Sequence, residues 1–215
     1  MLNKLKENYL LRSVLFYLLD GVETKRKIKG TEYKLFFNAG TNLNYFFKHK
    51  IQIENEASAN LSVIIKDNFL VFDIGAHIGY YTAILSSLSQ GGKIIAFEPD
   101  RENLKYLKKN VEENSLNNVT IIEKAVSSKV GQSSFYRDVN TGRTSSLETD
   151  AWHPNAVQIR QEIVNTTTLN EAAAQYGVPN FIKCDVEGHE VDVLKGAIEV
   201  LPNKPILFLE VRKDN

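Results

Sequence analysis

The sequence is poor in cysteine and tryptophan, has no net charge and contains no long apolar run. Its one cysteine, Cys184, excludes a disulfide framework and a cysteine-rich zinc cluster, so we expect a reducing, cytoplasmic location. The 26 basic and 26 acidic residues cancel, which removes the usual electrostatic reason to expect a nucleic-acid partner. The apolar stretch at 9–19 is shorter than the roughly 20 residues that cross a bilayer, so no transmembrane segment is predicted.

A chain of 215 residues, 43% apolar and 24% charged, is typical of one globular domain with a sizeable core. Its charge is uneven, because residues 1–50 hold more basic than acidic side chains and the remainder holds more acidic ones. This asymmetry is a weak indication of an acidic partner or a membrane surface, and a solvated basic face is the simpler explanation. We expect residues 1–54 to form a helix-and-strand extension and residues 55–215 to form the main domain.

From about residue 55 onward, helical and strand patterns alternate along the chain. That alternation predicts an α/β fold, a Rossmann-like parallel sheet with helices on both faces. The expected strands are 70–74, 93–97, 119–126, 181–184 and 206–211, and the expected helices are 55–66, 79–88, 101–113, 169–176 and 190–200. Residues 133–137 are expected to form a short hairpin strand. Residues 138–160 are expected to form a long surface loop, in which Arg143, Trp152 and His153 either form a substrate lid or pack on the domain.

The sharpest local feature is the segment 71–81, an apolar strand that leads into a glycine turn and then a helix. Ligands of open α/β sheets bind outside the carboxyl ends of the strands, which is where such a turn lies. Glu98 ends the next strand, and a carboxylate in that place accepts hydrogen bonds from the two hydroxyls of a ribose. The expected ligand is therefore a nucleoside.

The residues around this turn indicate which nucleoside the site takes. A dinucleotide fingerprint reads G-x-G-x-x-G, and its second glycine lets the backbone approach a pyrophosphate. Here His77 stands in that place, and the pattern is G-x-x-x-G, from Gly75 to Gly79. Asp73, just before the turn, is expected to face the ligand, to repel a diphosphate and to attract a cation. S-adenosylmethionine has a ribose, a sulfonium and no phosphate, so it suits the pair of Asp73 and Glu98.

Three motifs together resemble those of the FkbM-type methyltransferases, class I enzymes that depend on S-adenosylmethionine. The motifs are FDIGAHIGYYT at 72–82, AFEP at 96–99 and IKCDVEGHE at 182–190. The resemblance covers about residues 55–211. It implies a sheet of strand order 3-2-1-4-5 and transfer of a methyl group to an oxygen, often on a natural product or a sugar. The family commonly has Asn at the position of His77 and Ala at that of His189, and neither departure touches a carboxylate.

The resemblance and the residue chemistry together predict where the cofactor binds. Asp73, Gly75 and Gly79 are expected to shape the methionine end of the site. Glu98 is expected to hold the ribose, and Lys124 or Glu123 to border the adenine ring. The full set of predicted cofactor-binding residues is Asp73, Gly75, Ala76, His77, Gly79, Tyr80, Glu98, Pro99 and Lys124.

The loop after the fourth strand is predicted to carry catalysis, since that strand neighbours the first in the implied order. Methyl transfer to a hydroxyl needs alignment and gains from a base that removes the proton. The candidates, in order of preference, are Asp185, His189 and Glu187. A structural role is the alternative for at least one acidic residue here, because carboxylates are stabilised near a helix N-terminus. No metal site is predicted, because the D-x-E-x-H spacing matches no metal motif.

Two other functions remain open from the sequence. One is a nucleotide-dependent oxidoreductase of related fold, and the other is a non-catalytic binding or scaffold module in which Asp73 caps a helix and Gly75 turns the chain. Related enzymes continue beyond the fifth strand, so either the chain is truncated or its edge at 206–209 is covered. A bare edge of this kind predicts a homo-oligomer. The expected partner of the enzyme is a small-molecule or glycan acceptor.

Overall fold

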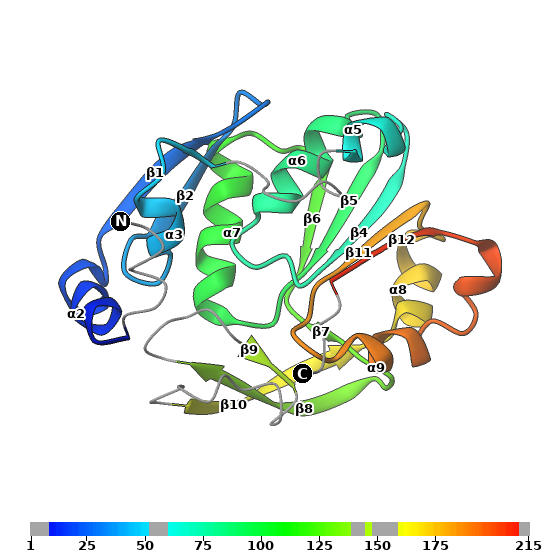
Figure 1. Cartoon of the computed structure of the whole chain (residues 1–215). Helices are drawn as coiled ribbons and strands as arrows, with labels where there is room; N and C mark the ends of the chain where they lie inside the picture. The colour runs from blue at the N-terminus through cyan, green and yellow to red at the C-terminus, as the bar shows by residue number, and fades with distance from the viewer. Residues whose placement is uncertain (1–8, 52–59, 139–144, 148–158, 211–215) are drawn as a thin grey trace.

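The computed structural model describes residues 9–51, 60–138, 145–147 and 159–210, which form three sheets and the helices around them (Figure 1). The largest sheet has five parallel strands in the order β12-β11-β4-β5-β6. These are β4 (Leu70–Ile74), β5 (Lys93–Phe97), β6 (Val119–Ile122), β11 (Phe181–Cys184) and β12 (Ile206–Leu209). In chain order this is 3-2-1-4-5, which confirms the predicted sheet and the α/β fold class.

Helices cover both faces of this sheet, because successive residues of a strand point to opposite sides. On β4, Val71 belongs to one buried cluster and Phe72 to another. The Val71 side is covered by α6 (Tyr80–Leu88) and α7 (Arg101–Glu113), and the Phe72 side by α8 (Leu169–Tyr176) and α9 (Glu190–Lys195). The core therefore lies in two layers, one on each side of the sheet.

Two helices begin where their sequences predict. Asp100 caps α7, and its carboxylate accepts hydrogen bonds from the backbone N–H groups of Glu102 at 2.8 Å and Asn103 at 3.0 Å. Thr168 caps α8, and its hydroxyl accepts from the N–H of Glu171 at 3.0 Å. Each such cap stabilises a helix by about 1 kcal/mol. The cap at Asp100 also fixes the end of the loop that carries Glu98.

The third strand and the segment after it differ from the prediction. β6 ends at Ile122, and a separate strand, β7 (Ala125–Val126), leaves the main sheet. It joins a second sheet of order β7-β10-β8-β9, with β8 (Gly131–Asp138), β9 (Ser145–Ser146) and β10 (Ile159–Thr167). The predicted hairpin strand is therefore part of a longer one, and the predicted loop is interrupted by β9. β10 was missed because most of its residues are polar and exposed, so no apolar alternation marks it.

Two predicted helices are shorter in the structure. The helix expected at 55–66 is described only as α5 (Leu61–Ile64), because the backbone turns extended at Ile65 and residues 52–59 lie outside the described ranges. The helix expected at 190–200 stops as α9 at Lys195, and a 3₁₀ turn, η1 (Leu201–Asn203), follows it. Gly196 marks this end: a Cβ there would lie 2.2 Å from the carbonyl oxygen of Ser127.

The N-terminal segment forms the third sheet and packs into the same core. It consists of α2 (Tyr9–Leu19), β1 (Glu23–Ile28), β2 (Lys34–Asn38), α3 (Leu43–Phe46) and β3 (Lys50–Ile51), with strand order β2-β1-β3. Ile28, Leu35 and Phe37 are fully buried in the cluster that contains Val71 and Ile94 of the main sheet. The extension is thus continuous with the core, and a domain boundary near residue 54 stays a prediction.

β12 lies at one end of the main sheet, as far as the chain is described. Its Ile206 is 41% exposed and its Leu207 39% exposed, whereas Phe208 packs on the rings of Tyr81 and Phe181. Pairing of this edge with a second chain stays a prediction.

Asn110 near the end of α7 and Asn114, the residue that follows the helix, attach the extension to the main domain through hydrogen bonds to its backbone. Asn110 is 1% exposed, and its side-chain oxygen accepts from the N–H of Phe36 at 2.6 Å. Its amide donates to the carbonyl oxygens of Phe36 at 2.9 Å and of Ile78 at 2.8 Å. Four residues later, the half-buried Asn114 makes two similar bonds with the backbone of Lys34. Its side-chain oxygen accepts from the N–H of Lys34 and its amide donates to the carbonyl oxygen of Lys34, both at 2.8 Å. α7 thereby serves as a further hydrogen-bonding partner of the edge strand β2.

We expect Asn110→Ala to lower the free energy of unfolding by about 2–4 kcal/mol, because it leaves buried backbone groups of Phe36 and Ile78 without partners. Asn114→Ala is the matched control and should cost about 1 kcal/mol or less, since water can replace its bonds. Urea denaturation followed by circular dichroism measures both values. Equal, small losses in the two variants would show that the buried asparagine does not anchor the extension.

Candidate active site

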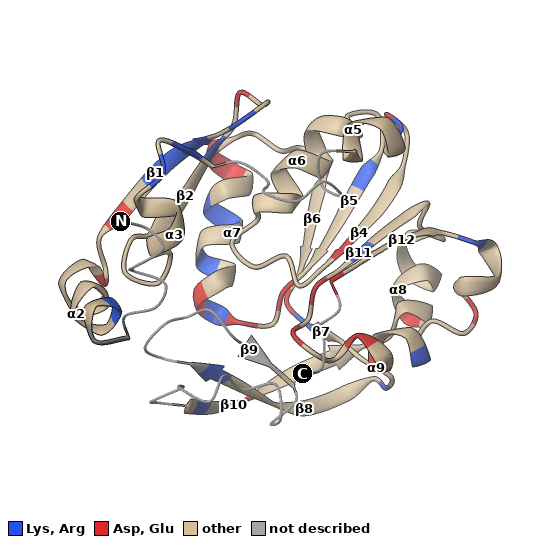
Figure 2. Cartoon of the chain, viewed as in Figure 1, with Lys and Arg blue, Asp and Glu red and all other residues tan. Residues whose placement is uncertain are grey.

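A cavity of about 210 Å³ opens at the carboxyl ends of the main strands. Its walls come from the loops after β4, β5, β6 and β11, and the second sheet closes one side through β7 and β8 (Figure 1). Acidic residues gather in these loops at the centre of the molecule (Figure 2). The predicted site residues that line the cavity are Gly75, Ala76, His77, Tyr80, Glu98, Pro99, Lys124, Asp185, Glu187 and His189.

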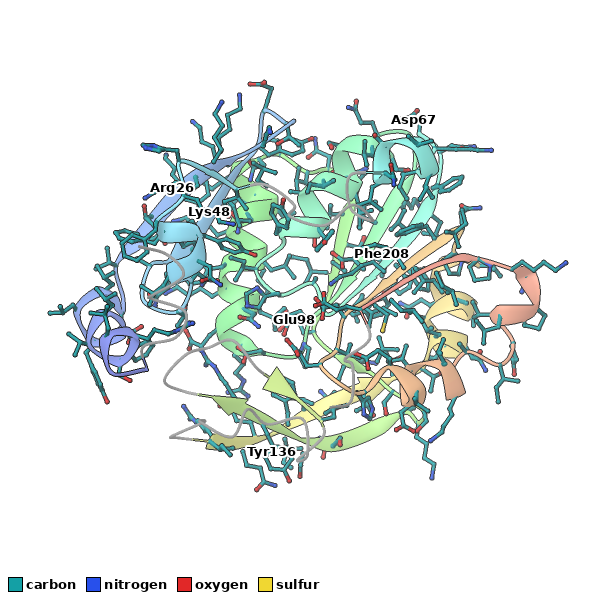
Figure 3. All side chains as sticks on the ribbon, viewed as in Figure 1. Arg26, Lys48, Asp67, Glu98, Tyr136 and Phe208 are labelled. Carbon is teal, nitrogen blue, oxygen red and sulfur yellow. The ribbon has the colours of Figure 1, made fainter. Side chains whose placement is uncertain are left out.

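Glu98 lines the cavity, lies near the middle of the molecule (Figure 3) and is 4% exposed. Its Oε2 accepts a hydrogen bond from the N–H of His77 at 2.7 Å, and its Oε1 accepts from the N–H of Asp100 at 2.9 Å. The side-chain amide of Asn103 donates to Oε1 at 3.4 Å. Burial, together with the nearby Asp100 carboxylate, raises the pKa of Glu98 to about 7. Two loops therefore hold a carboxylate that is about half ionised near neutral pH.

The loop after β4 takes its shape from three residues in the left-handed backbone region. Gly75 has a φ of 72°, His77 a φ of 52° and Gly79 a φ of 90°. Among residues with a Cβ, Asn, Asp and His adopt this conformation most readily, which explains why histidine can replace the Asn common in the FkbM pattern. Burial lowers the pKa of His77, so its ring is neutral at pH 7.

Gly75 brings the loops after β4 and β11 into direct contact. A Cβ atom on Gly75 would lie 1.9 Å from the carbonyl oxygen of Asp185, so only glycine permits this approach. Gly79 has a different neighbour, because a Cβ there would lie 2.8 Å from Cδ1 of Leu107 on α7. Its positive φ and its closeness to α7 both favour glycine, and Gly79 is not among the residues that line the cavity; its predicted contact with the cofactor stays a prediction.

Asp73 does not line the cavity either, which corrects the prediction that it faces the ligand. Strand alternation turns its fully buried side chain toward α6, where Oδ2 accepts a hydrogen bond from the Thr82 hydroxyl at 2.6 Å. Its Oδ1 lies 3.5 Å from Nζ of Lys183, its partner in register on β11. The cation that Asp73 attracts is therefore a side chain of the protein.

Lys183 is a site residue that the sequence analysis missed. It lines the cavity although its side chain is only 4% exposed. Its Nζ donates to the carbonyl oxygen of Gly75 at 2.9 Å and lies 3.7 Å from Oδ2 of Asp185. Burial alone lowers the pKa of Lys183, but the carboxylates of Asp73 and Asp185 outweigh burial and raise it above its ordinary value. A lysine inside an otherwise apolar strand is the signal that could have found it.

His189 lines the cavity, but its ring is also in contact with side chains of the fold. Nε2 lies 2.9 Å from Oγ of Ser127, and Nδ1 lies 3.9 Å from Oδ2 of Asp192. These contacts make the imidazole less available to an acceptor than a carboxylate of the same loop.

The acidic residues of the loop after β11 have different environments. Asp185, whose side chain is 30% exposed, lines the cavity beside Lys183. Glu187, with a φ of 54°, lines it as well. Glu190 is 8% exposed and accepts a hydrogen bond from the N–H of Gly188 at 3.1 Å. Glu190 therefore has the structural role expected for one acidic residue of this loop.

An aromatic wall of the cavity was only partly predicted. Tyr80 was expected at the site, and Tyr45 and Tyr81 join it in the lining. The ring centroids of Tyr45 and Tyr80 are 6.2 Å apart, and those of Tyr80 and Tyr81 are 5.4 Å apart. Tyr45 belongs to α3 of the N-terminal extension, so no motif of the main domain marks it.

The remaining candidates have mixed outcomes. Lys124 lines the cavity, whereas its alternative, Glu123, forms an ion pair with Lys108 at 2.7 Å. The lid candidates at 143, 152 and 153 lie outside the described residues. Burial and the nearby Glu190 raise the pKa of the Cys184 thiol to about 12. Within the described ranges, no group of three His, Cys, Asp or Glu residues could hold a metal ion, and no helix there could cross a membrane.

Comparison with known families bears on one of the alternatives that the sequence left open. The methyltransferase FkbM domain matches residues 73–215. The chain belongs to this family. The match confirms the resemblance that the three motifs indicate. It also shows that the chain contains a methyltransferase domain whose cofactor is S-adenosylmethionine. It decides against an oxidoreductase.

Two curated relatives of this FkbM chain are each 25% identical to it. Hexuronic acid methyltransferase AglP of Haloferax volcanii aligns over 147 residues, which cover 68% of this chain and 57% of that protein. Methyltransferase 1 of Beauveria bassiana aligns over 185 residues, with 77% of this chain and 72% of that protein covered. The solved precorrin-6y C5,15-methyltransferase of Geobacter metallireducens is 15% identical, with a TM-score of 0.43 and coverage of 73% of this chain and 62% of that one. Because the chain spans little more than half the length of AglP, the activity and substrate of the whole protein are proposals.

We expect Gly75→Ala to lower the free energy of unfolding by about 3 kcal/mol or more, because the added methyl group is strained at positive φ and meets the Asp185 backbone. Gly30→Ala is the matched control: Gly30 has a φ of 83°, and a Cβ there meets nothing within 4 Å. Gly30→Ala should lower the free energy of unfolding by only about 1–2 kcal/mol, which is the cost of placing a residue with a Cβ in the left-handed conformation. Guanidinium denaturation compares the two, and equal losses would mean that contact between the loops is unimportant.

Affinity for S-adenosylhomocysteine should rise with pH as Glu98 ionises. The carboxylate form accepts hydrogen bonds from the two ribose hydroxyls more strongly than the protonated form does, so binding lowers the raised pKa of Glu98 and strengthens as pH increases through about 7. We expect a gain of roughly tenfold between pH 6 and pH 8, measured by isothermal titration. Glu98→Gln, which cannot ionise, should bind more weakly and show no such slope. A flat profile for the wild type would contradict the placement of the ribose at Glu98.

Proposed function

We propose that this FkbM chain transfers the methyl group of S-adenosylmethionine to a hydroxyl oxygen of a glycan or a small hydroxylated molecule. The observation that carries the proposal is the cavity that Glu98 and Asp185 line together from the ends of different strands. Glu98 suits the ribose of the cofactor, and Asp185 suits the hydroxyl group of an acceptor. The two carboxylates thus divide the cavity into a cofactor end and an acceptor end.

The donor and acceptor groups around Glu98 fit a nucleoside. Oε2 accepts one bond, from the N–H of His77, and keeps a lone pair for a ribose hydroxyl. Oε1 accepts from the N–H of Asp100 and more weakly from Asn103 at 3.4 Å, a long bond that a second ribose hydroxyl could replace. Gly75, Ala76 and His77 would hold the methionine part of S-adenosylmethionine, and Lys124 would border its adenine ring. When bound, the cofactor supplies an electrophilic methyl group on a positively charged sulfur.

Residues of the chain supply alignment and a base at the acceptor end. Asp185 can accept the proton of an acceptor hydroxyl as the oxygen gains its methyl group, and Glu187 on the same loop is the second candidate. A positioned base of this kind contributes about 10²–10⁴-fold to the rate. Tyr45, Tyr80 and Tyr81 supply an apolar part of the lining, which suits a cyclic acceptor.

A glycan is the acceptor class that the comparisons favour. The name of the AglP relative specifies a hexuronic acid, and the aromatic residues in the lining of this cavity suit a cyclic acceptor. A hexuronic acid residue in a glycan is accordingly the acceptor class to test first.

Initial-rate measurements with S-adenosylmethionine and methyl glycosides of hexoses and hexuronic acids test this function. We expect release of S-adenosylhomocysteine, with the new methyl group on a hydroxyl oxygen by tandem mass spectrometry. Asp185→Asn should lower kcat by about 10²–10⁴-fold while the protein still binds S-adenosylhomocysteine, because the variant loses its base but keeps Glu98.

Glu112→Gln, at an exposed position on α7, is the control and should retain full activity. Methylation of a carboxylate or a nitrogen would contradict the proposal. A folded protein that binds S-adenosylhomocysteine and methylates none of the glycosides would favour the non-catalytic binding module instead.

A further inference from the structure

Lys183 places a buried positive charge directly beside the proposed base Asp185. Its side chain is 4% exposed, yet it lines the same cavity as Asp185. The carboxylates around it hold its pKa above the ordinary value, so at neutral pH the group is an ammonium ion. Lys183 therefore cannot serve as a base, but it can donate hydrogen bonds to a ligand.

The three N–H groups of Lys183 are not all used in close hydrogen bonds. One donates to the carbonyl oxygen of Gly75 at 2.9 Å. The other contacts are longer, with Nζ 3.5 Å from the carbonyl oxygen of Ile74, 3.5 Å from Oδ1 of Asp73 and 3.7 Å from Oδ2 of Asp185. The last two are ion pairs beyond the usual hydrogen-bond distance of about 3 Å, so the ammonium keeps donor capacity for an acceptor.

The distance between Lys183 and Asp185 allows one acceptor oxygen to contact both side chains. A single oxygen can lie about 2.8 Å from two atoms that are 3.7 Å apart, which is an ordinary hydrogen-bond distance to each. In that position a hydroxyl group donates its proton to the carboxylate and accepts a hydrogen bond from the ammonium. The ring of Tyr81, whose centroid is 5.3 Å from Nζ, lies against the same ammonium.

We propose that Lys183 is a catalytic residue that donates a hydrogen bond to the acceptor oxygen and stabilises the negative charge developing there. This assignment rests on the proposed O-methyl transfer. The new bond joins the acceptor oxygen to the methyl carbon, while the bond from that carbon to sulfur breaks and leaves its electron pair on sulfur. The hydroxyl proton passes to Asp185 and from its 30% exposed side chain to solvent. Lys183 keeps its proton throughout.

Two other roles for the same ammonium predict different results. A purely structural partner of Asp73 would affect stability but not the rate per folded molecule. An anchor for the carboxylate of the cofactor would affect the affinity for S-adenosylhomocysteine and leave the rate at saturation unchanged. Affinity, rate and stability must therefore be measured on the same variants.

The experiment compares the wild type with Lys183→Met, using the methyl glycoside that the wild type methylates fastest. We expect kcat to fall by about 10²–10³-fold, the usual loss when one fixed donor to a developing charge is removed, with S-adenosylhomocysteine affinity nearly unchanged. Lys183→Met leaves the buried Asp73 carboxylate without its cation and can impair folding. The double variant Asp73→Asn/Lys183→Met also removes the negative charge at position 73. The side-chain amide oxygen introduced there can still accept a hydrogen bond from Thr82.

Chemical rescue separates a catalytic ammonium from a structural one. Methylammonium should restore part of the lost rate to Lys183→Ala, because it fits the space left by the truncated side chain. It should have no effect on Lys183→Met, which fills that space. Lys93→Met, at the exposed start of β5, is the control for loss of a lysine and should match the wild type.

Four results would overturn the assignment. A folded double variant with wild-type kcat would show that the ammonium is structural, and a loss of S-adenosylhomocysteine affinity at unchanged kcat would assign it to the cofactor. Lower kcat in Lys183→Ala without rescue by methylammonium would also contradict a direct role. If the wild type itself methylates none of the glycosides, the proposed function fails and this inference fails with it.

Discussion

The pairing of Asp73 on β4 with Lys183 on β11 is the interaction on which the rest of the site depends. The two side chains are neighbours in register within an apolar sheet, and neither charge could be buried there without the other. Lys183 also holds the carbonyl group of Gly75 and lies near Asp185, so one cation joins both loops that face the cavity. The backbone contact of Gly75 with Asp185 strengthens the same connection.

Segments far apart in the chain complete the cavity around this centre. The second sheet closes one side, and Tyr45 reaches the lining from the N-terminal extension, which Asn110 attaches to α7. The family match begins at residue 73, so Tyr45 lies outside the matched region. The lining of the cavity thus combines residues of the matched region with one from the N-terminal extension.

The main sheet could be predicted from the sequence because each of its strands is a short, mostly apolar run followed by a glycine or an acidic residue. Glu98, which follows β5, is an example. The position of Asp73 before the turn does not by itself show where its side chain points; the alternation of strand residues does, and it turns Asp73 toward Thr82 on α6. Lys183 was missed for a related reason: its partner is set by the register of two strands distant in sequence. β10 was missed because a polar, exposed antiparallel strand has no apolar signal.

A crystal structure of the complex with S-adenosylhomocysteine tests the central claim most directly. We predict that both ribose hydroxyls donate to the Glu98 carboxylate, and that the sulfur atom faces the gap between Lys183 and Asp185 while the ion pair with Asp73 is retained. A ribose bound away from Glu98, or a Lys183 side chain displaced from Asp73 by the ligand, would contradict the account.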